Sequence, residues 1–287
     1  MTGVRPSDSP VDGADGRGLF VRPAGHGLPG RLIVLEGIDG SGRSTHARLL
    51  EDVLRYRGRG VTRTSLATSV LSAEPIRRAK RDRASGPVAT TLLYAADLAE
   101  RMEQLILPAL RAGLVVLADR YAYTPMARAE ARGLDRAWVE KLFSFVVPAD
   151  LVLFLDVDPA TILQRRPLQP TVDPYEAGAD LRLSADVLEG YRLFQDRLYR
   201  CFSRYVERYG LRRVPAAGTI HQVERGLERA ALALIEAQAT RRPVSVRSKA
   251  ASVRATPAGS DPGPASVRPK AIGSDPGQTD RSARVVE

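Results

Sequence analysis

EGIDGSGRST, residues 36–45, has the glycine spacing of a phosphate-binding loop. Residues 37–44 fit the pattern G-x-x-x-x-G-K-[S/T] except at Arg43, which takes the place of lysine. An apolar run at 32–35 precedes the loop and reads as a buried strand, and the spacing of Leu50, Val53 and Leu54 indicates an amphipathic helix after it. A strand, a glycine-rich turn and a helix in this order predict a site for the phosphates of a nucleotide.

The residue types in this loop have chemical reasons to be there. Glycines let backbone N–H groups turn toward a phosphate, and the N-terminus of the following helix favours its negative charge. The hydroxyl of Ser44 can bind Mg²⁺. Arg43 keeps the positive charge of lysine but is longer and planar, so we interpret the loop as a functional variant, with an inactive loop or a turn without ligand as alternatives. The predicted nucleotide-binding residues are Gly37, Ile38, Asp39, Gly40, Ser41, Gly42, Arg43, Ser44 and Thr45.

Short apolar runs alternate with helical patterns through the middle of the chain. Residues 32–35, 114–117 and 151–155 read as strands buried on both faces, and weaker strand signals lie at 61–64 and 211–214. Helical spacing covers residues 49–54, 92–109, 138–143 and 187–205; Pro108 should bend or end the second helix, and Gly210 should follow the fourth. Thr219 and Gln222 suit a capping box for a last helix. The alternation predicts an α/β fold with a doubly wound parallel sheet and a ligand at the carboxyl ends of its strands.

Composition limits the classes of function. The 287 residues are 44% hydrophobic, which favours a packed globular protein. A single cysteine, Cys201, excludes an internal disulfide and a cysteine metal site and favours a cytoplasmic location. No apolar run reaches the ~18 residues of a membrane span. The chain has a net charge of +10, of which residues 241–287 carry +5 and residues 31–240 the remaining +5. This excess is mild for the middle part, so basicity alone is a weak argument for nucleic-acid binding.

Two terminal segments differ from this middle part. Residues 1–29 are rich in Gly, Pro, Asp and Ser and lack an apolar period, so we expect a disordered leader. Residues 241–287 carry nine Lys/Arg against four Asp/Glu and repeat ASVR and GSDPG. Such a segment is typical of a disordered basic low-complexity tail, with a tether for nucleic acid or a partner as the alternative. Residues 30–240 are the predicted folded domain.

A second polar signal follows the strand at 114–118. Asp119 and Arg120 come directly after it, at the sheet edge where the phosphate loop is also expected. An aspartate there can organise Mg²⁺-bound water or hold a substrate hydroxyl, and an arginine can neutralise a transferring phosphoryl group. A surface ion pair at a strand end is the alternative.

Four blocks of sequence resemble the thymidylate kinase family of nucleoside monophosphate kinases. They are LIVLEGIDGSGRST (32–45), LLYAADLAERMEQLILPALRAGLVVLADRYAYT (92–124), LVLFLDVDPATILQRR (151–166) and DPYEAG (173–178), in the order of the family. The resemblance implies a five-stranded parallel sheet, a homodimer, ATP with Mg²⁺ as the phosphoryl donor, and dTMP as the acceptor.

The same resemblance implies roles for individual residues. Asp39 matches a loop acid near the acceptor's phosphate and sugar, and Tyr94 an aromatic ring that stacks on the acceptor base. Residues 165–180 match a lid that closes over the site. The implied catalytic residues are Asp39, Arg43, Asp119, Arg120, Arg165 and Arg166; the acceptor-binding residues are Tyr94, Arg101, Tyr175 and Glu176; the metal ligands are Ser44 and Asp119.

Some positions depart from the family. Leu98 replaces an arginine that contacts thymine in relatives, and Pro125 and Arg128 replace polar side chains near the base and sugar. The usual R-E-P-G after the second strand is absent. We therefore expect Arg101, on a nearby helical face, to compensate in part for Leu98.

The predicted reaction is the ATP-dependent phosphorylation of dTMP to dTDP. The departures leave alternatives open: another nucleotide or nucleoside as acceptor, a nucleotide-binding regulatory protein with little catalysis, or a nucleic-acid-binding module.

Overall fold

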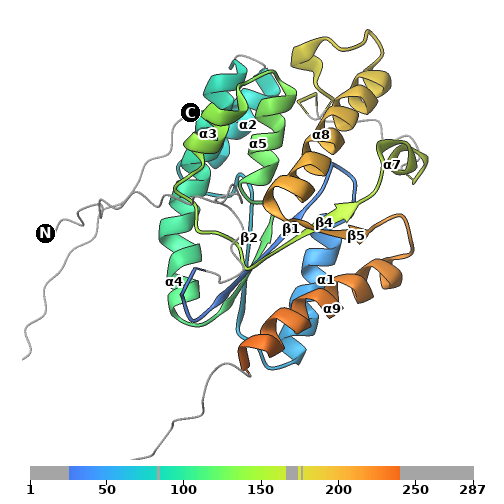
Figure 1. The fold of residues 1–287 in the computed structure, drawn as a ribbon. Helices are drawn as coiled ribbons and strands as arrows, with labels where there is room; N and C mark the ends of the chain where they lie inside the picture. The colour runs from blue at the N-terminus through green and yellow to red at the C-terminus, as the bar shows by residue number, and fades with distance from the viewer. Residues whose placement is uncertain (1–25, 83–84, 166–173, 176, 240–287) are drawn as a thin grey trace, which may run out of the picture. The chain divides into compact units, whose positions relative to one another are not determined.

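A five-stranded parallel sheet, in the order β2-β3-β1-β4-β5, organises the chain (Figure 1). The computed structural model describes residues 26–82, 85–165, 174–175 and 177–239. The strands are β1 (Arg31–Glu36), β2 (Val61–Ser65), β3 (Val115–Asp119), β4 (Leu151–Asp156) and β5 (Arg212–Pro215). The predicted α/β fold and all five predicted strands are confirmed.

The pairing of the strands brings the polar signals together. β1 lies between β3 and β4, with Leu35 opposite Asp119, and Asp119 is also opposite Ser65 of β2. The apolar residues of β1, β3 and β4 are almost wholly buried, because helices cover both faces of the sheet. The phosphate loop after β1 therefore begins beside Asp119.

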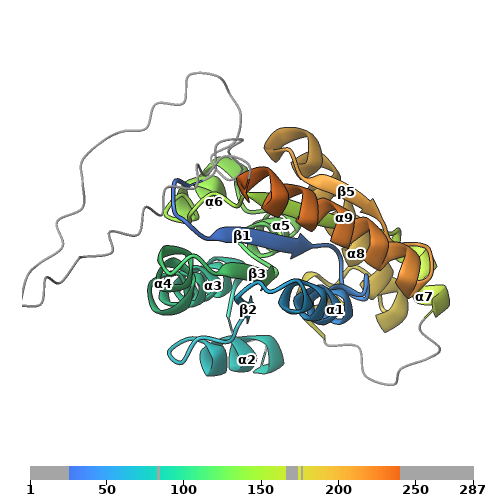
Figure 2. The same ribbon diagram turned by 90° about the horizontal axis from the view of Figure 1, so that it is seen from below.

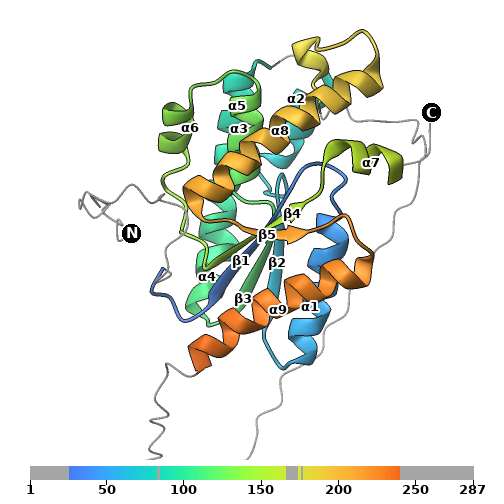
Figure 3. The same ribbon diagram turned by 45° about the vertical axis from the view of Figure 1, so that its right-hand side comes forward.

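Helices surround the sheet on both sides. α1 (Arg43–Tyr56) and α9 (Ile220–Ala239) pack against each other on one face, and α3 (Pro87–Arg101), α5 (Tyr123–Ala131) and α8 (Val187–Tyr209) lie on the other (Figures 1 and 3). Figure 2, the view from below, shows β1 in the middle with helices on either side. The remaining helices are α2 (Ala73–Asp82), η1 (Met102–Ile106), α4 (Leu107–Arg111), α6 (Arg136–Leu142), α7 (Pro159–Arg165) and η2 (Ala179–Leu181).

Local signals explain several helix ends. α8 stops before Gly210, whose φ of 71° is left-handed, as its position in the sequence predicts. Thr219 and Gln222 form the expected capping box, with Thr219 N donating to Gln222 Oε1 at 2.8 Å. The helix over 92–109 does not end at Pro108. A π-helical turn, η1, precedes the proline, which lies in the first turn of α4, where its missing N–H is tolerated.

The aromatic stripe of α8 belongs to the core, as predicted. Tyr191, Phe194, Phe202 and Tyr205 are buried, and Phe202 stacks on Phe154 of β4 at 5.3 Å between ring centroids. Val187, in the first turn of α8, is 60% exposed and does not join the stripe.

Most of the two predicted terminal segments lies outside the described residues, namely 1–25 and 241–287. Residues 26–29 of the predicted leader are described, and the buried side chain of His26 lies 2.9 Å from Asp150. No helix within the described ranges is long and apolar enough to cross a membrane.

Candidate functional site

The loop between β1 and α1 has the conformation that its glycines permit. Gly40 and Gly42 have φ values of 87° and 91°, in the left-handed region that other residues avoid. A Cβ atom on Gly37 would lie 2.7 Å from Ser41 Oγ, so that position also requires glycine. Gly42 caps α1, whose N-terminal N–H groups follow directly. The loop and the helix start thus form the frame of an anion site.

The side chain of Arg43 folds back into this loop. Its Nη1 donates to the carbonyl oxygens of Gly37 and Ile38, the latter at 2.6 Å, and to Ser41 Oγ at 3.3 Å. Its Nε lies 3.4 Å from Asp119 Oδ1. The side chain is only 6% exposed, and burial lowers the pKa of its guanidinium. The cation is therefore held inside the loop by backbone carbonyls, where lysine would be expected.

Ser44 and Asp119 meet beside the loop. Ser44 Oγ donates to Asp119 Oδ2 at 2.5 Å. A hydroxyl and a single carboxylate, completed by phosphate oxygens and water, are the hard oxygen donors that Mg²⁺ prefers, so these two residues fit the ion that the sequence implies. No cluster of three or more His, Cys, Asp or Glu side chains suited to a metal occurs in the part of the chain that the structure describes.

Asp39 is the charge centre of the site. Its carboxylate accepts from Arg120 Nη2, from Arg128 Nη2 at 3.4 Å to both oxygens, and from Gln195 Nε2 at 3.2 Å. Burial alone would raise its pKa, but Arg120, Arg128 and Arg43 together hold the pKa of Asp39 well below its usual range. An ionised Asp39 with its lone pairs occupied orients arginines, and is poorly placed to accept a proton.

Glu36, at the end of β1, holds the segment that follows β3. Its carboxylate accepts from Tyr121 N at 2.8 Å and from Thr124 Oγ1 at 2.6 Å. Burial raises the pKa of Glu36, against the opposing effect of these donors and of Arg120 and Arg43. The start of α5 is thereby fixed to the strand that carries the phosphate loop.

A row of side chains along α5 faces the site. Arg120, just before the helix, has a left-handed φ of 75° and donates to Thr124 Oγ1 at 3.3 Å. Arg128 and Arg132 follow Thr124 at intervals of four, the spacing that places side chains on one helix face. Arg128 Nη1 donates to Tyr94 Oη at 3.1 Å. Sequence reasoning named Arg128 only as a departure from the family near the base and sugar and did not name Arg132, although this spacing after Asp119-Arg120 was visible.

Two cavities open at the carboxyl ends of β1, β2 and β3. One holds about 270 Å³ of water-accessible space and the other about 420 Å³, and both are lined by Ser44, Ser65 and Asp119. The first extends to Arg120, Arg128 and Tyr94; its further lining residues are Leu66, Ala67 and Lys80. Ser44 of the phosphate loop and Tyr94, one of the predicted acceptor-binding residues, thus line the same cavity.

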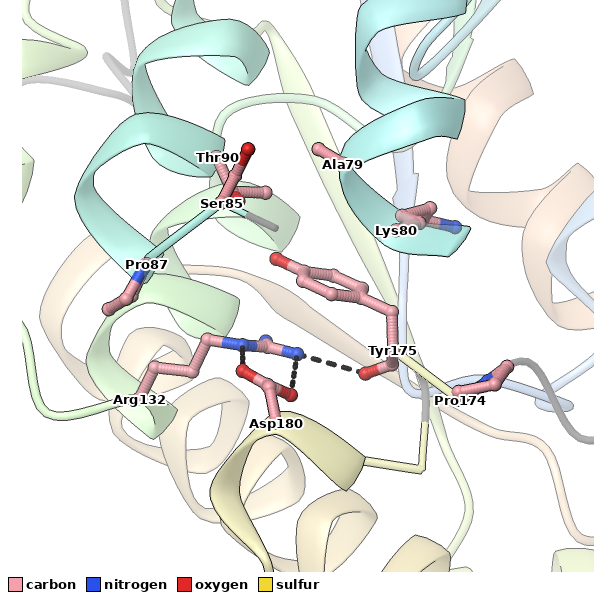
Figure 4. A pocket seen from close by; sticks show the side chains of 9 residues that line it. All are labelled: Ala79, Lys80, Ser85, Pro87, Thr90, Arg132, Pro174, Tyr175 and Asp180. Atoms are coloured by element: carbon pink, nitrogen blue, oxygen red, sulfur yellow. Dashed lines mark hydrogen bonds and ion pairs between the residues drawn. The ribbon is translucent and has the colours of Figure 1, made fainter. Parts of the chain in front are cut away.

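Tyr175 lines a separate, small pocket together with Lys80, Arg132 and Asp180 (Figure 4). Lys80 also lines the cavity of about 270 Å³. Cζ of the Arg132 guanidinium lies 3.7 Å from the centroid of the Tyr175 ring, and Nζ of Lys80 in α2 lies 5.7 Å from the same centroid. Arg132 also binds Asp180, with Nε 2.8 Å from Oδ2, and donates to the Tyr175 carbonyl at 2.9 Å. Arg132 therefore fastens Tyr175 and Asp180 to α5.

Other predicted site residues lie elsewhere. Arg101 binds Asp97, with Nε 3.0 Å from Oδ2, and donates to Thr64 Oγ1 at 3.2 Å, and it lines neither cavity. Arg165 donates to the carbonyls of Ala216 and Ala217, away from Asp119. Arg166, Glu176 and residues 166–173 of the predicted lid fall outside the described residues.

Comparisons with known proteins agree with this arrangement. The family model described as thymidylate kinase matches residues 35–178. "Probable thymidylate kinase 2" of Saccharolobus solfataricus is 36% identical over 178 residues, which are 62% of this chain and 83% of the relative. "Probable thymidylate kinase" of Pyrococcus horikoshii is 38% identical, over 54% of this chain and 78% of the relative. "Thymidylate kinase" of Brachyspira hyodysenteriae is 33% identical, over 48% and 68% respectively.

Proposed function

The chain belongs to the thymidylate kinase family and is a nucleoside monophosphate kinase, and on this premise we propose that it transfers the γ-phosphoryl group of ATP to dTMP. The observation that carries the proposal is the meeting of the loop at 37–44 with Asp119 and Arg120 at adjacent strand ends. ATP can then bind at the loop and dTMP on the other side of Asp119 and Arg120, with the transferred phosphoryl group between them.

The charge of the site supports a phosphorylated acceptor. Four cationic side chains border the site, namely Arg43, Lys80, Arg120 and Arg128. The carboxylates of Glu36, Asp39 and Asp119 lie among them. A phosphate that carries close to two negative charges at neutral pH would be attracted to this cluster of cations.

The chemistry asks little covalent work of the protein. Phosphoryl transfer needs two anions aligned, water excluded and the developing charge neutralised. Backbone N–H groups of the loop and of the start of α1 would bind the β- and γ-phosphates, and Arg120 would neutralise the charge on the transferring group. Mg²⁺, held by Ser44 and Asp119, would supply further charge neutralisation when bound.

The side chains around Tyr94 support an acceptor base that offers carbonyl oxygens. Lys80 is a hydrogen-bond donor only, and Leu98 is buried and apolar. Thymine and uracil present two carbonyl oxygens, whereas cytosine and adenine each present an amino group, a donor that Lys80 cannot pair with. We therefore place dTMP first, followed by dUMP and UMP.

Turnover across a panel of acceptors tests the proposal. ADP release would be measured by a coupled assay with ATP and Mg²⁺ against dTMP, dUMP, UMP, CMP and AMP. We expect the highest kcat/KM with dTMP and the lowest with CMP and AMP. Release of ADP that does not depend on any of these acceptors would refute the proposed reaction, and a preference for AMP or CMP would refute the base assignment.

We also propose that the enzyme is a homodimer, as the family resemblance implies. Val88 and Leu92 are 47% and 46% exposed and lie one turn apart on α3, which leaves apolar surface available to a second copy. Light scattering coupled to size exclusion should give twice the chain mass, and Leu92→Glu should shift it to that of the monomer. A wild-type monomer at all concentrations would exclude this assembly.

A further inference from the structure

Arg128 is a buried cation in the wall of the cavity of about 270 Å³. It lines this cavity together with Ser44, Asp119 and Arg120, yet its side chain is only 4% exposed. Burial of a guanidinium is unfavourable unless anionic partners and hydrogen bonds compensate. The placement of this charge beside the reacting centre therefore calls for an explanation from function.

Several arginines pair with the same carboxylates near Arg128. Asp39 pairs with Arg120, Arg43 and Arg128, and Arg128 Nη2 lies 3.4 Å from each of its carboxylate oxygens. Arg43 Nε also lies 3.4 Å from Asp119 Oδ1. Asp39 thus gathers three guanidinium groups at one place, and Glu36 is a further carboxylate near Arg120 and Arg43. Two of these arginines, Arg120 and Arg128, also line the cavity, where a bound anion would face both of them.

The geometry also suits a phosphate group. Arg120 and Arg128 bind the same Asp39 carboxylate, so their guanidinium groups lie close together on one side of the cavity. Guanidinium forks match the oxygens of a phosphate better than a point charge does. Because Glu36 fixes the start of α5 and both arginines belong to the same row, the pair is held in position before any ligand binds.

We propose that Arg128 binds the phosphate of the acceptor together with Arg120, and that Asp39 is the positioning residue for both. This inference rests on the proposed function, because it names how that acceptor is held. Under this proposal, the second arginine that binds phosphate lies on α5. The loop after β2 lacks the R-E-P-G sequence of relatives, and Arg165 binds the carbonyls of Ala216 and Ala217 instead. The contact of Arg128 with Tyr94 is then a support for its orientation.

Two other roles are open to the same side chain and predict different results. As a reader of sugar or base, Arg128 would matter equally for a nucleotide and its nucleoside. As a structural counter-ion of Asp39, it would matter for stability and for neither ligand. Comparing dTMP with thymidine, which lacks the phosphate, separates the three roles.

The test uses the full chain with Arg128→Gln and Arg128→Lys. We expect Arg128→Gln to raise the KM for dTMP about 10- to 100-fold, the loss expected for charge-assisted hydrogen bonds, and to leave the inhibition constant of thymidine unchanged. Arg128→Lys keeps the charge without the fork and should give a smaller rise. Arg136→Gln, a charge deletion at a half-exposed arginine of α6 paired with Glu130, is the control and should leave both constants unchanged.

Further measurements guard against loss of structure. Thermal unfolding would verify that the variants are folded, and competition by inorganic phosphate should weaken in both Arg128 variants. Asp39→Asn should likewise raise the KM for dTMP and spare thymidine. Equal changes for dTMP and thymidine, or an unchanged KM for dTMP, would overturn the inference. Failure of the wild type to phosphorylate dTMP would instead refute the proposed function, and the comparison would then use the acceptor that is turned over and its nucleoside.

Discussion

The hydroxyl oxygen of Ser44 lies 2.5 Å from Oδ2 of Asp119, although 75 residues separate them in the sequence. The two residues meet because β1 and β3 are parallel neighbours, with Leu35 opposite Asp119. A hydroxyl from the start of α1 and a carboxylate from the end of β3 thus share one point. This is the place at which a phosphate-bound magnesium ion fits the donor set.

Ser44→Ala should therefore reduce turnover and change its dependence on Mg²⁺. We expect kcat to fall about 100-fold, with a higher Mg²⁺ concentration at half-maximal rate, because one oxygen ligand is lost. Steady-state ADP release over a range of Mg²⁺ concentrations measures both effects. Thr161→Ala in α7, which deletes a hydroxyl bound to Asp158 just before that helix, is the control and should behave as wild type. An unchanged Mg²⁺ dependence for Ser44→Ala would argue against a role for this hydroxyl in metal binding.

Substitutions of Arg43 test whether the arginine in the phosphate loop performs the role that lysine has in the usual pattern. Its guanidinium donates to the Ile38 carbonyl at 2.6 Å and must leave such contacts to meet a phosphate. Arg43→Lys keeps the charge and should hold kcat within about 10-fold of wild type, whereas Arg43→Met should weaken ADP binding about 100-fold. Titration calorimetry with ADP measures the second effect. Wild-type affinity in Arg43→Met would show that the loop binds nucleotide without this cation.

Much of the fold followed from local signals in the sequence. The apolar runs at 32–35 and 151–155 form the predicted strands, and Gly210 ends α8 as predicted. The loop glycines have the positive φ values that a tight turn requires, because all these features act through their immediate neighbours. The surroundings of a side chain depend on distant segments, which periodicity does not report. Arg128 reaches Asp39, 89 residues away, and Arg165 turns to Ala216, 51 residues away. The sequence therefore predicted the strand ends correctly but left unknown which arginines face the site.

Arg101 is paired with a carboxylate on its own helix. It forms a buried ion pair with Asp97, which in turn accepts from the backbone N–H groups of Ala67 and Ser69. Arg101→Ala should lower the free energy of unfolding by about 3 kcal/mol, because it leaves a buried carboxylate without its cation. Arg77→Ala, at an exposed pair with Glu74, should change it by no more than about 0.5 kcal/mol. Urea unfolding measures both, and equal losses would contradict the buried-pair argument.

Glu36 should give the stability of the protein a recognisable pH dependence. Burial raises its folded pKa above the unfolded value, so the folded state binds the proton more tightly, and the contribution of Glu36 to stability falls as pH rises between the two pKa values. Glu36→Gln cannot ionise but can still accept from Tyr121 N. Relative to wild type, its free energy of unfolding should therefore increase from about pH 5 to about pH 8. Urea unfolding at both pH values checks this, and a pH-independent difference would contradict the raised pKa.

Arg120 combines a strained backbone with a side chain at the proposed reacting centre. Its φ of 75° lies in the left-handed region, which costs a non-glycine residue about 1 kcal/mol. Arg120→Ala and Arg120→Gly both remove the guanidinium that binds Asp39, so each should lower kcat about 10³-fold. They should differ in stability, with the glycine variant higher by about 1 kcal/mol in free energy of unfolding, because only alanine retains the strain.

The same pair of substitutions at Arg55, within α1, provides the control for the backbone argument. There glycine should be less stable than alanine by about 1 kcal/mol, the reverse order, because the site is helical. The order at Arg120 thus reports its left-handed conformation, and the order at Arg55 reports helix propensity. Wild-type turnover in either Arg120 variant would remove this arginine from the reaction, while the same order at both positions would show that residue 120 is unstrained.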